Sequence, residues 1–223
     1  MKRAKPMNAD IKRMLETIRQ EARLTAVYTG RAQFADKVMS SMAEVNRADF
    51  VPQVAHSQAF TNAPLAIGYG QTISQPFIVA LMTDLLDLSP DDRVLEVGTG
   101  SGYQAAVLAK LARQVYSIER IESLQESAAS RLKQHGFDNV SCRHSNGYEG
   151  WPEQAPFDAI LVTAACSSVP PALLEQLKPG GRMILPLAEN GLYQELTLIT
   201  KNAQGETESK PLLAVSFVPL IDD

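Results

Sequence analysis

The glycine-rich segment Gly98-Thr-Gly-Ser-Gly102 limits the possible folds of this chain more than any other feature. It directly follows the apolar run Val94-Leu-Glu-Val97, which is typical of a buried strand, and it precedes a helical pattern. Glycines are needed where a chain reverses tightly and a ligand approaches the backbone. The order of strand, glycine turn and helix therefore predicts a ligand-binding turn in a parallel sheet.

The residues after 89 repeat this alternation of short apolar runs and helical stretches. The expected strands cover residues 93–97, 115–118, 140–143, 157–162 and 182–187, with helices near 103–112, 121–135 and 170–177. Such alternation predicts an α/β fold with a doubly wound, mostly parallel sheet that has helices on both faces. Residues 193–200 and 212–218, joined by a polar turn at 202–210, are expected to form an antiparallel edge.

Residues 8–88, which precede this alternation, follow a different pattern. Apolar residues recur at helical spacing over 8–45, with a break at Gly30, and predict an N-terminal helical extension. Prolines and glycines interrupt residues 50–75 and predict an irregular loop, whose apolar residues argue against disorder. The next helix is expected over 77–88, with Ser74 in a good N-cap position.

Composition argues against several classes of function. The net charge of −4 gives no argument for a nucleic-acid partner, and the basic residues near the start, such as Lys2, Arg3 and Lys5, are interpreted as a solvated helix face. No apolar run approaches the length of a membrane span, and the N-terminus lacks the apolar core of a signal peptide. Two cysteines make no disulfide framework, so we expect a cytoplasmic protein. The three histidines show no metal-ligand spacing, and no metal is expected.

Three residues around the glycine turn indicate the kind of ligand. A dinucleotide-binding turn has a glycine where this chain has Tyr103. Glu96 stands two residues before Gly98, where the cationic end of a cofactor is favoured and a pyrophosphate is not. Glu119 ends the second strand, about 20 residues further on, where an acid can accept hydrogen bonds from both ribose hydroxyls. That last position suits NAD as well, so it does not discriminate alone.

The pattern E-x-G-x-G-x-G with the later acid resembles the first motifs of class I S-adenosylmethionine-dependent methyltransferases. The segment Pro64-Leu-Ala-Ile-Gly-Tyr-Gly-Gln-Thr-Ile-Ser-Gln-Pro76 closely resembles the hallmark loop of the protein-L-isoaspartate O-methyltransferase family. The other segments that resemble this family are residues 45–52, 117–120, 155–165, 176–181 and 217–220. The match is collinear from about residue 35 to residue 220.

This resemblance implies a Rossmann-like sheet and S-adenosylmethionine as cofactor. It also implies transfer of a methyl group to the side carboxylate of L-isoaspartyl residues in damaged proteins and peptides, after which the ester collapses to a succinimide and repair begins. We therefore expect a single methyltransferase domain over 1–223, with N-terminal helices and a substrate loop at 1–75 and a cofactor-binding core at 76–223. The protein is expected to act as a monomer.

The resemblance also implies the residues of the site. Ser74 is implied as the catalytic residue beside the substrate carboxylate, and no strong base is required because that oxygen is already ionised at neutral pH. The residues implied in cofactor binding are Thr72, Glu96, Gly98, Thr99, Gly100, Gly102, Glu119, Arg120, Asn146, Gly147 and Thr163. Those implied in substrate binding are Ile73, Ser74, Val218 and Pro219.

One segment departs from the family pattern. After the third strand the family usually carries Gly-Asp-Gly, whose acid accepts the adenine amino group, and this chain has Ser145-Asn-Gly147. Asn146 can still accept through its amide oxygen. Three alternatives stay open at this point: a methyltransferase directed to another carboxylate, a binding module without catalysis, and a NAD-dependent oxidoreductase.

Overall fold

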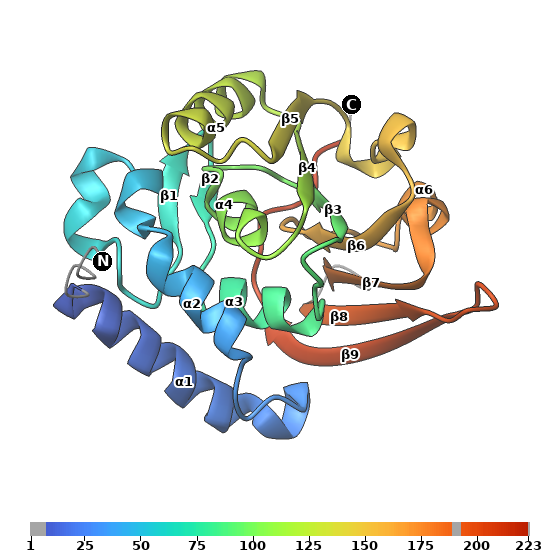
Figure 1. Ribbon diagram of the computed structural model, residues 1–223, viewed down its shortest axis with the longest axis horizontal. Helices are drawn as coiled ribbons and strands as arrows, with labels where there is room; N and C mark the ends of the chain where they lie inside the picture. Colours follow the sequence, from blue (N-terminus) through green and yellow to red (C-terminus); the bar gives the residue numbers. More distant parts are fainter. Residues whose placement is uncertain (1–7, 189–192, 223) are drawn as a thin grey trace.

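The computed structural model describes residues 8–188 and 193–222 and contains a seven-stranded sheet with helices on both faces (Figure 1). Lys2, Arg3 and Lys5, interpreted above as part of a helix face, lie outside the described residues. The strand order is β5-β4-β3-β6-β7-β8-β9. The strands are β3 (Arg93–Val97), β4 (Gln114–Glu119), β5 (Val140–His144), β6 (Phe157–Val162), β7 (Leu177–Leu187), β8 (Gln194–Lys201) and β9 (Thr207–Val215).

The five strands from β5 to β7 pair in parallel, and β8 and β9 continue the sheet as antiparallel strands. The main helices are α1 (Ala9–Thr29), α2 (Asp36–Glu44), α3 (Pro76–Leu85), α4 (Tyr103–Ala109), α5 (Glu122–Gln134) and α6 (Pro171–Gln176). The short 3-10 helices are η1 (Arg47–Phe50), η2 (Gln53–Gln58), η3 (Gly147–Glu149) and η4 (Pro152–Gln154). The predicted α/β architecture with its antiparallel edge is confirmed.

The strands form two hydrophobic cores because successive side chains point to opposite faces of the sheet. Along β6, Ala159 and Leu161 belong to the core shared with α1 to α5, whereas Ile160 and Val162 belong to the core shared with α6. Strands buried on both faces carry continuous apolar runs, which is why the sequence pattern located them well. Every residue of α3 is buried, and α1 and α2 pack on its outer side (Figure 1).

Two expectations for the N-terminal part are wrong. Residues 50–75 are not irregular, because they contain η2 and an antiparallel hairpin of β1 (Leu65–Gly68) and β2 (Gln71–Ile73). The hairpin reverses at Tyr69 and Gly70, whose φ angles of 54° and 71° satisfy the turn. Ser74 is not the N-cap of α3, since Gln75 occupies that position and makes no side-chain cap. The Phe77 N–H instead donates to Asn62 Oδ1 at 3.0 Å.

The C-terminal edge also differs from the expectation. Strand β9 begins at Thr207 and ends at Val215, so the predicted strand over 212–218 and the predicted turn over 202–210 are both displaced. A tight turn closes between Asn202 and Glu206, where the Asn202 N–H donates to the Glu206 carbonyl at 2.9 Å. The polar residues that follow lie in an exposed edge strand, so their polarity reflects exposure and not a loop.

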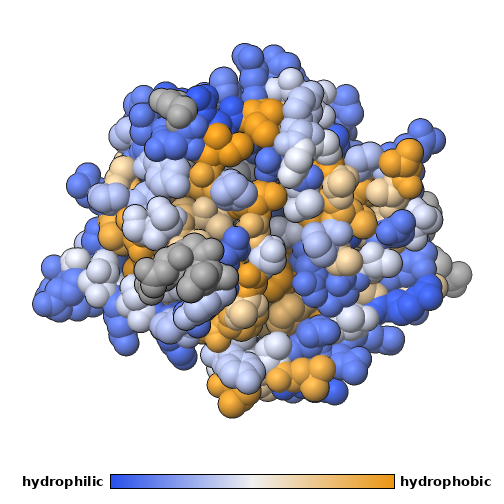
Figure 2. Space-filling view, turned by 180° about the vertical axis from the view of Figure 1, so that it is seen from behind, coloured by the Kyte–Doolittle hydropathy of each residue, from blue (hydrophilic) through white to orange (hydrophobic). Residues whose placement is uncertain are grey.

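The surface is mixed in character. Figure 2 shows a band of apolar side chains that crosses the face opposite to the view of Figure 1, with polar residues on both sides. Within residues 8–188 and 193–222, no helix combines the length and the apolar character needed to span a bilayer.

Candidate active site

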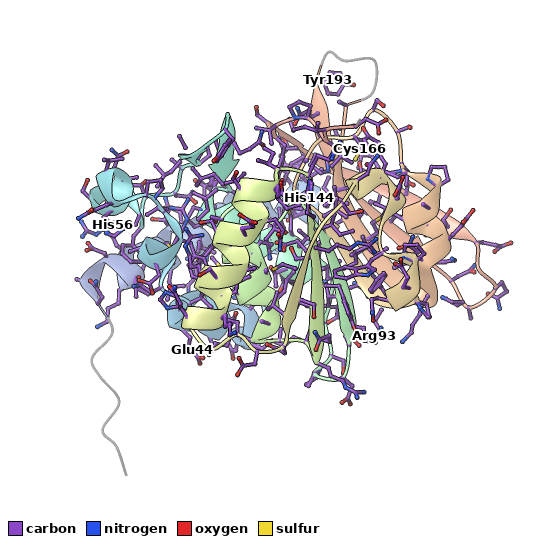
Figure 3. All side chains as sticks on the ribbon, turned by 90° about the horizontal axis from the view of Figure 1, so that it is seen from above. Glu44, His56, Arg93, His144, Cys166 and Tyr193 are labelled. Atoms are coloured by element: carbon purple, nitrogen blue, oxygen red, sulfur yellow. The ribbon has the colours of Figure 1, made fainter. Side chains whose placement is uncertain are left out.

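A pocket opens at the carboxyl ends of β3, β4 and β6. The chain leaves β3 for α4 on one face of the sheet and leaves the neighbouring β6 for α6 on the other face, and doubly wound folds bind ligands at such a position. Figure 3 shows His144 and Cys166 at this end of the sheet and Arg93, the first residue of β3, at the other. The predicted site residues that line the pocket are Thr72, Ile73, Ser74, Gly98, Thr99, Gly100, Glu119, Arg120, Gly147, Thr163, Val218 and Pro219. Glu96, Gly102 and Asn146 do not line it.

The glycine turn is held tightly against the sheet. The N–H groups of Gly98 and Thr99 both donate to the Ile118 carbonyl, at 2.8 and 3.1 Å. Gly98 has a φ of 96°, and a Cβ atom there would collide with Thr163 Oγ1. Gly102 has a φ of 87° and forms the N-cap of α4. Glycine is therefore required at position 98 both for its backbone conformation and for lack of space.

Glu119 presents a fixed carboxylate to the pocket. Its Oε2 accepts from the Gly100 N–H at 2.8 Å, and its Oε1 accepts from the Ile121 N–H at 3.0 Å. Each carboxylate oxygen can accept a second hydrogen bond. The side chain is thus oriented by the turn it adjoins and keeps acceptor capacity for a ligand hydroxyl.

Glu96 lies beneath the pocket and has no exposed surface. Ser117 Oγ donates to Glu96 Oε2, and Thr99 Oγ1 lies 2.6 Å from Ser117 Oγ, while Glu96 Oε1 has no hydrogen-bond partner. Burial raises the pKa of Glu96 to about 8; the Ser117 hydrogen bond lowers it, and the nearby Glu119 charge raises it further. Glu96 reaches the pocket only through the chain of hydroxyls from Ser117 to Thr99.

A second cavity of about 560 Å³ adjoins the first. The residues that line both cavities are Thr72, Ser74, Thr163 and Val218. Its outer wall comes from α1, through Glu21 and Thr25, and from residues 213–217 at the end of the sheet. The Ser74 hydroxyl makes no hydrogen bond within the described part of the chain, so it is available to a ligand where the two cavities meet.

The C-terminal segment, residues 218–221, forms one wall of the pocket. The Ala165 N–H donates to the Val218 carbonyl at 2.8 Å, and the Leu220 N–H donates to the Ala165 carbonyl at 2.8 Å. These two bonds hold the segment beside the loop that follows β6. Val218 and Leu220 consequently form part of the pocket wall.

The family is decided by comparison with known proteins. The model of the protein-L-isoaspartate(D-aspartate) O-methyltransferase family matches residues 19–223. The chain belongs to this family. A protein-L-isoaspartate O-methyltransferase of Syntrophobacter fumaroxidans is 54% identical over 215 residues, which cover 96% of this chain and 87% of the relative. A namesake from Nitrosococcus oceani is 54% identical over 207 residues, covering 93% and 94%.

Solved structures of protein-L-isoaspartate O-methyltransferases have the same fold. One superposes with a TM-score of 0.82 at 26% identity and covers 94% of this chain and 65% of its own. Another, from Plasmodium falciparum in complex with S-adenosyl-L-homocysteine, superposes with a TM-score of 0.80 at 26% identity, covering 97% and 100%. This member of the family is an S-adenosylmethionine-dependent carboxyl O-methyltransferase, as the resemblance implied.

The residues of this methyltransferase fit that cofactor. The backbone of Gly98 and Gly100 is open to the pocket because neither residue has a side chain, and Glu119 supplies an oriented acceptor. Glu96 lies beneath the pocket with a raised pKa, so it adds little negative charge at neutral pH, and Glu119 is the carboxylate that the pocket offers to a ligand. The Glu119 carboxylate thus matches a nucleoside with free hydroxyls better than it matches a pyrophosphate.

The atypical Asn146 is already engaged in this methyltransferase. Its Oδ1 accepts from the Tyr148 N–H at 2.9 Å, and its Nδ2 donates to Asp222 Oδ1 at 2.9 Å. The adenine-binding role implied for Asn146 stays a prediction, because its side chain caps η3 and lies outside the pocket lining. Gly147 does line the pocket, and a Cβ there would collide with Val97.

Three residues at or behind the candidate site were not predicted from the sequence. Arg47 and Asn62 hold the segment that carries Ser74, and Glu21 borders the second cavity. Only the position of Arg47 inside the family-like segment 45–52 could have drawn attention to it. Cys166 is buried, and burial raises the pKa of its thiol to about 12, which disfavours the reactive thiolate at neutral pH. No group of acidic, histidine and cysteine side chains in the described ranges could hold a metal.

Proposed function

We propose that this methyltransferase acts on the free carboxylate of an L-isoaspartyl residue at Ser74, where the two cavities meet. The single observation that carries this assignment is that Ser74 lines both cavities and has a hydroxyl without a partner in the described part of the chain. The methyl ester formed there collapses to a succinimide, which begins the repair of the damaged protein.

The chemistry requires little from the side chains beyond placement. When bound, S-adenosylmethionine supplies an electrophilic methyl group. The acceptor oxygen is ionised at neutral pH, so the site must orient it and exclude water. A hydroxyl can donate to one oxygen of the carboxylate and leave the other free to react. Ser74 is suited to this role because a neutral donor blunts the nucleophile less than a cation would.

Each cavity is assigned one ligand, the cofactor to the inner pocket and the polypeptide to the outer cavity. Gly98, Gly100 and Glu119 hold the cofactor in the inner pocket, with the C-terminal segment as its cover. Thr163 donates to the Val97 and Gly98 carbonyls and fixes the turn at the border of both cavities. The damaged polypeptide lies in the outer cavity between α1 and the end of β9.

The partners follow from this assignment. The substrates are proteins and peptides that contain isoaspartyl residues, and we assign no role to nucleic acid or to membranes. The whole chain functions as one domain, since a single hydrophobic core joins Met14 of α1 to Val94 of the sheet. It acts as a monomer in the cytoplasm.

A paired-peptide assay tests the function. The protein is incubated with labelled S-adenosylmethionine and either an L-isoaspartyl peptide or the same peptide with normal aspartate. We expect base-labile methyl incorporation into the isoaspartyl peptide alone. Equal labelling of the two peptides would overturn the proposal, and labelling of neither, with S-adenosylmethionine bound, would indicate a dedicated partner or a module that binds without catalysis.

A further inference from the structure

Arg47 is a fully buried arginine at the centre of the substrate segment. Its Nη1 donates to the Ala59 carbonyl, and its Nη2 donates to the carbonyls of Ala63 and Ser74, both at 3.0 Å. One side chain from η1 therefore ties together three points of the segment that ends at Ser74. The guanidinium group lies directly behind the residue at which the two cavities meet.

The charge of Arg47 is not balanced by an acid. Its hydrogen-bond partners are neutral carbonyl oxygens, and no carboxylate within residues 8–188 and 193–222 forms an ion pair with it. Its Nε has no hydrogen-bond partner, and its guanidinium lies 5.9 Å from the centre of the Tyr103 ring. Burial lowers the pKa of Arg47 to about 10, so the group stays charged at neutral pH. A buried cation without a counter-charge is costly, and an anion bound on the other side of Ser74 would reduce that cost.

We propose that Arg47 is a positioning residue whose unbalanced charge attracts the free carboxylate of the isoaspartyl substrate to Ser74. This inference rests on the function proposed above. The cation acts through the Ser74 main chain, since its described hydrogen bonds all go to main-chain carbonyls. The substrate carboxylate thereby gains a favourable potential without a direct ion pair.

The indirect arrangement has a kinetic consequence. The negative charge of the carboxylate disappears as the methyl group is transferred, so a contacting arginine would stabilise the bound substrate more than the transition state. Arg47 is separated from the substrate by Ser74. Its charge therefore favours binding of the anion, while Arg47 makes no hydrogen bond to the reacting oxygen. We therefore expect the charge of Arg47 to act mainly on KM and its three hydrogen bonds to act mainly on kcat.

The test compares two peptides that differ only in charge. One carries the isoaspartyl residue, and the other carries a carboxamide in place of its free carboxylate and is measured as a competitive inhibitor. The ratio of their affinities reports the preference for the anion. We expect Arg47→Gln, which keeps N–H donors and loses the charge, to lower this preference by about tenfold. We expect Arg47→Lys to keep the preference at pH 7 while kcat falls.

Asn62→Ala is the matched control, because it loosens the start of α3 beside the same segment without changing any charge. It is expected to lower stability and kcat and to leave the preference for the anion unchanged. S-adenosylhomocysteine binding, measured by calorimetry, shows that each variant is folded. An unchanged preference in folded Arg47→Gln would overturn the proposal and reduce Arg47 to a structural clamp.

A pH series on Arg47→Lys gives a second measurement that does not depend on the glutamine variant. A buried lysine has a lowered pKa, so the preference for the anion should disappear between pH 7 and pH 9.5 in this variant and persist in the wild type. A preference that does not change with pH in Arg47→Lys would contradict the proposal. Failure of the wild type to methylate the isoaspartyl peptide would instead reject the proposed function itself.

Discussion

The Thr163 hydroxyl donates a hydrogen bond to the Gly98 carbonyl at 2.6 Å and fills the space that a side chain at position 98 would need. The two residues directly follow the neighbouring strands β3 and β6, and together they fix the glycine turn that lines the pocket. Thr163, which the family resemblance implied in cofactor binding, therefore also has a structural role.

Gly98→Ala tests this relationship. We expect it to weaken cofactor binding by about tenfold or more, because the turn must shift away from Thr163. Gly136→Ala is the matched control, since Gly136 has a φ of 75° with open space around it and carries backbone strain alone. That control should cost about 1 kcal/mol of stability and leave cofactor affinity unchanged. Partial recovery in Gly98→Ala with Thr163→Ala would confirm the steric origin, and no recovery would contradict it.

Ser74→Ala separates catalysis from helix capping. We expect kcat to fall by about 100-fold while cofactor affinity and thermal stability stay close to those of the wild type, because Ser74 does not cap α3. Asn62→Ala should instead cost about 1 kcal/mol of stability, since Asn62 accepts the hydrogen bond from the Phe77 N–H. Methylation kinetics and thermal unfolding of both variants give the comparison. A loss of stability in Ser74→Ala equal to that in Asn62→Ala would argue against this division.

Asn146→Asp restores the acid that the family usually carries. Because Asp222 is nearby, we do not expect this single substitution to tighten cofactor binding. The new carboxylate would lose the hydrogen bond to Asp222 and face it as a like charge. We expect affinity no better than that of the wild type for this single variant, and several-fold better affinity for Asn146→Asp combined with Asp222→Asn. Calorimetry with S-adenosylhomocysteine measures both. Tighter binding by the single variant would show that Asp222 does not oppose the acid.

Glu96 should make stability depend on pH. Burial raises the pKa of Glu96 from 4.5 to about 8, so the folded protein holds this proton more tightly than the unfolded chain. The resulting stabilisation is complete below pH 4.5 and is lost as the pH rises through 8, by at most about 1.4 kcal/mol per pH unit. Glu96→Gln cannot ionise and should lack this dependence. Denaturant unfolding of both proteins from pH 5 to pH 9 checks it, and equal pH slopes would disprove it.

The parallel strands could be predicted because burial on both faces leaves a continuous apolar run. Residues 93–97 and 157–162 were located to the residue for this reason. The edge strand β9 was misplaced because Thr207 and its neighbours are exposed, and their polarity looks like that of a turn. Turn-forming residues such as Gly70 likewise marked a hairpin that was interpreted as an irregular loop.

Much of the candidate site was predictable where a motif sets the backbone, as at Gly98 and Gly100. The contributions of Arg47 and Asn62 were not, because each acts on residues far along the chain through main-chain atoms that no pattern reveals. The placement of Glu96 below the pocket could not be predicted either. Spacing gives the strand and the position of an acid but not the hydroxyl chain that separates it from the ligand.

The shared border of the two cavities has a consequence for how this enzyme can diversify. Thr72 and Val218 line both cavities, so we expect a larger side chain at either position to affect cofactor and polypeptide binding together. Glu21 and Thr25 on α1 border the outer cavity alone. New preferences for the residues that flank the damage can therefore arise on one face of the N-terminal helix, while the methyl-donor machinery stays as it is.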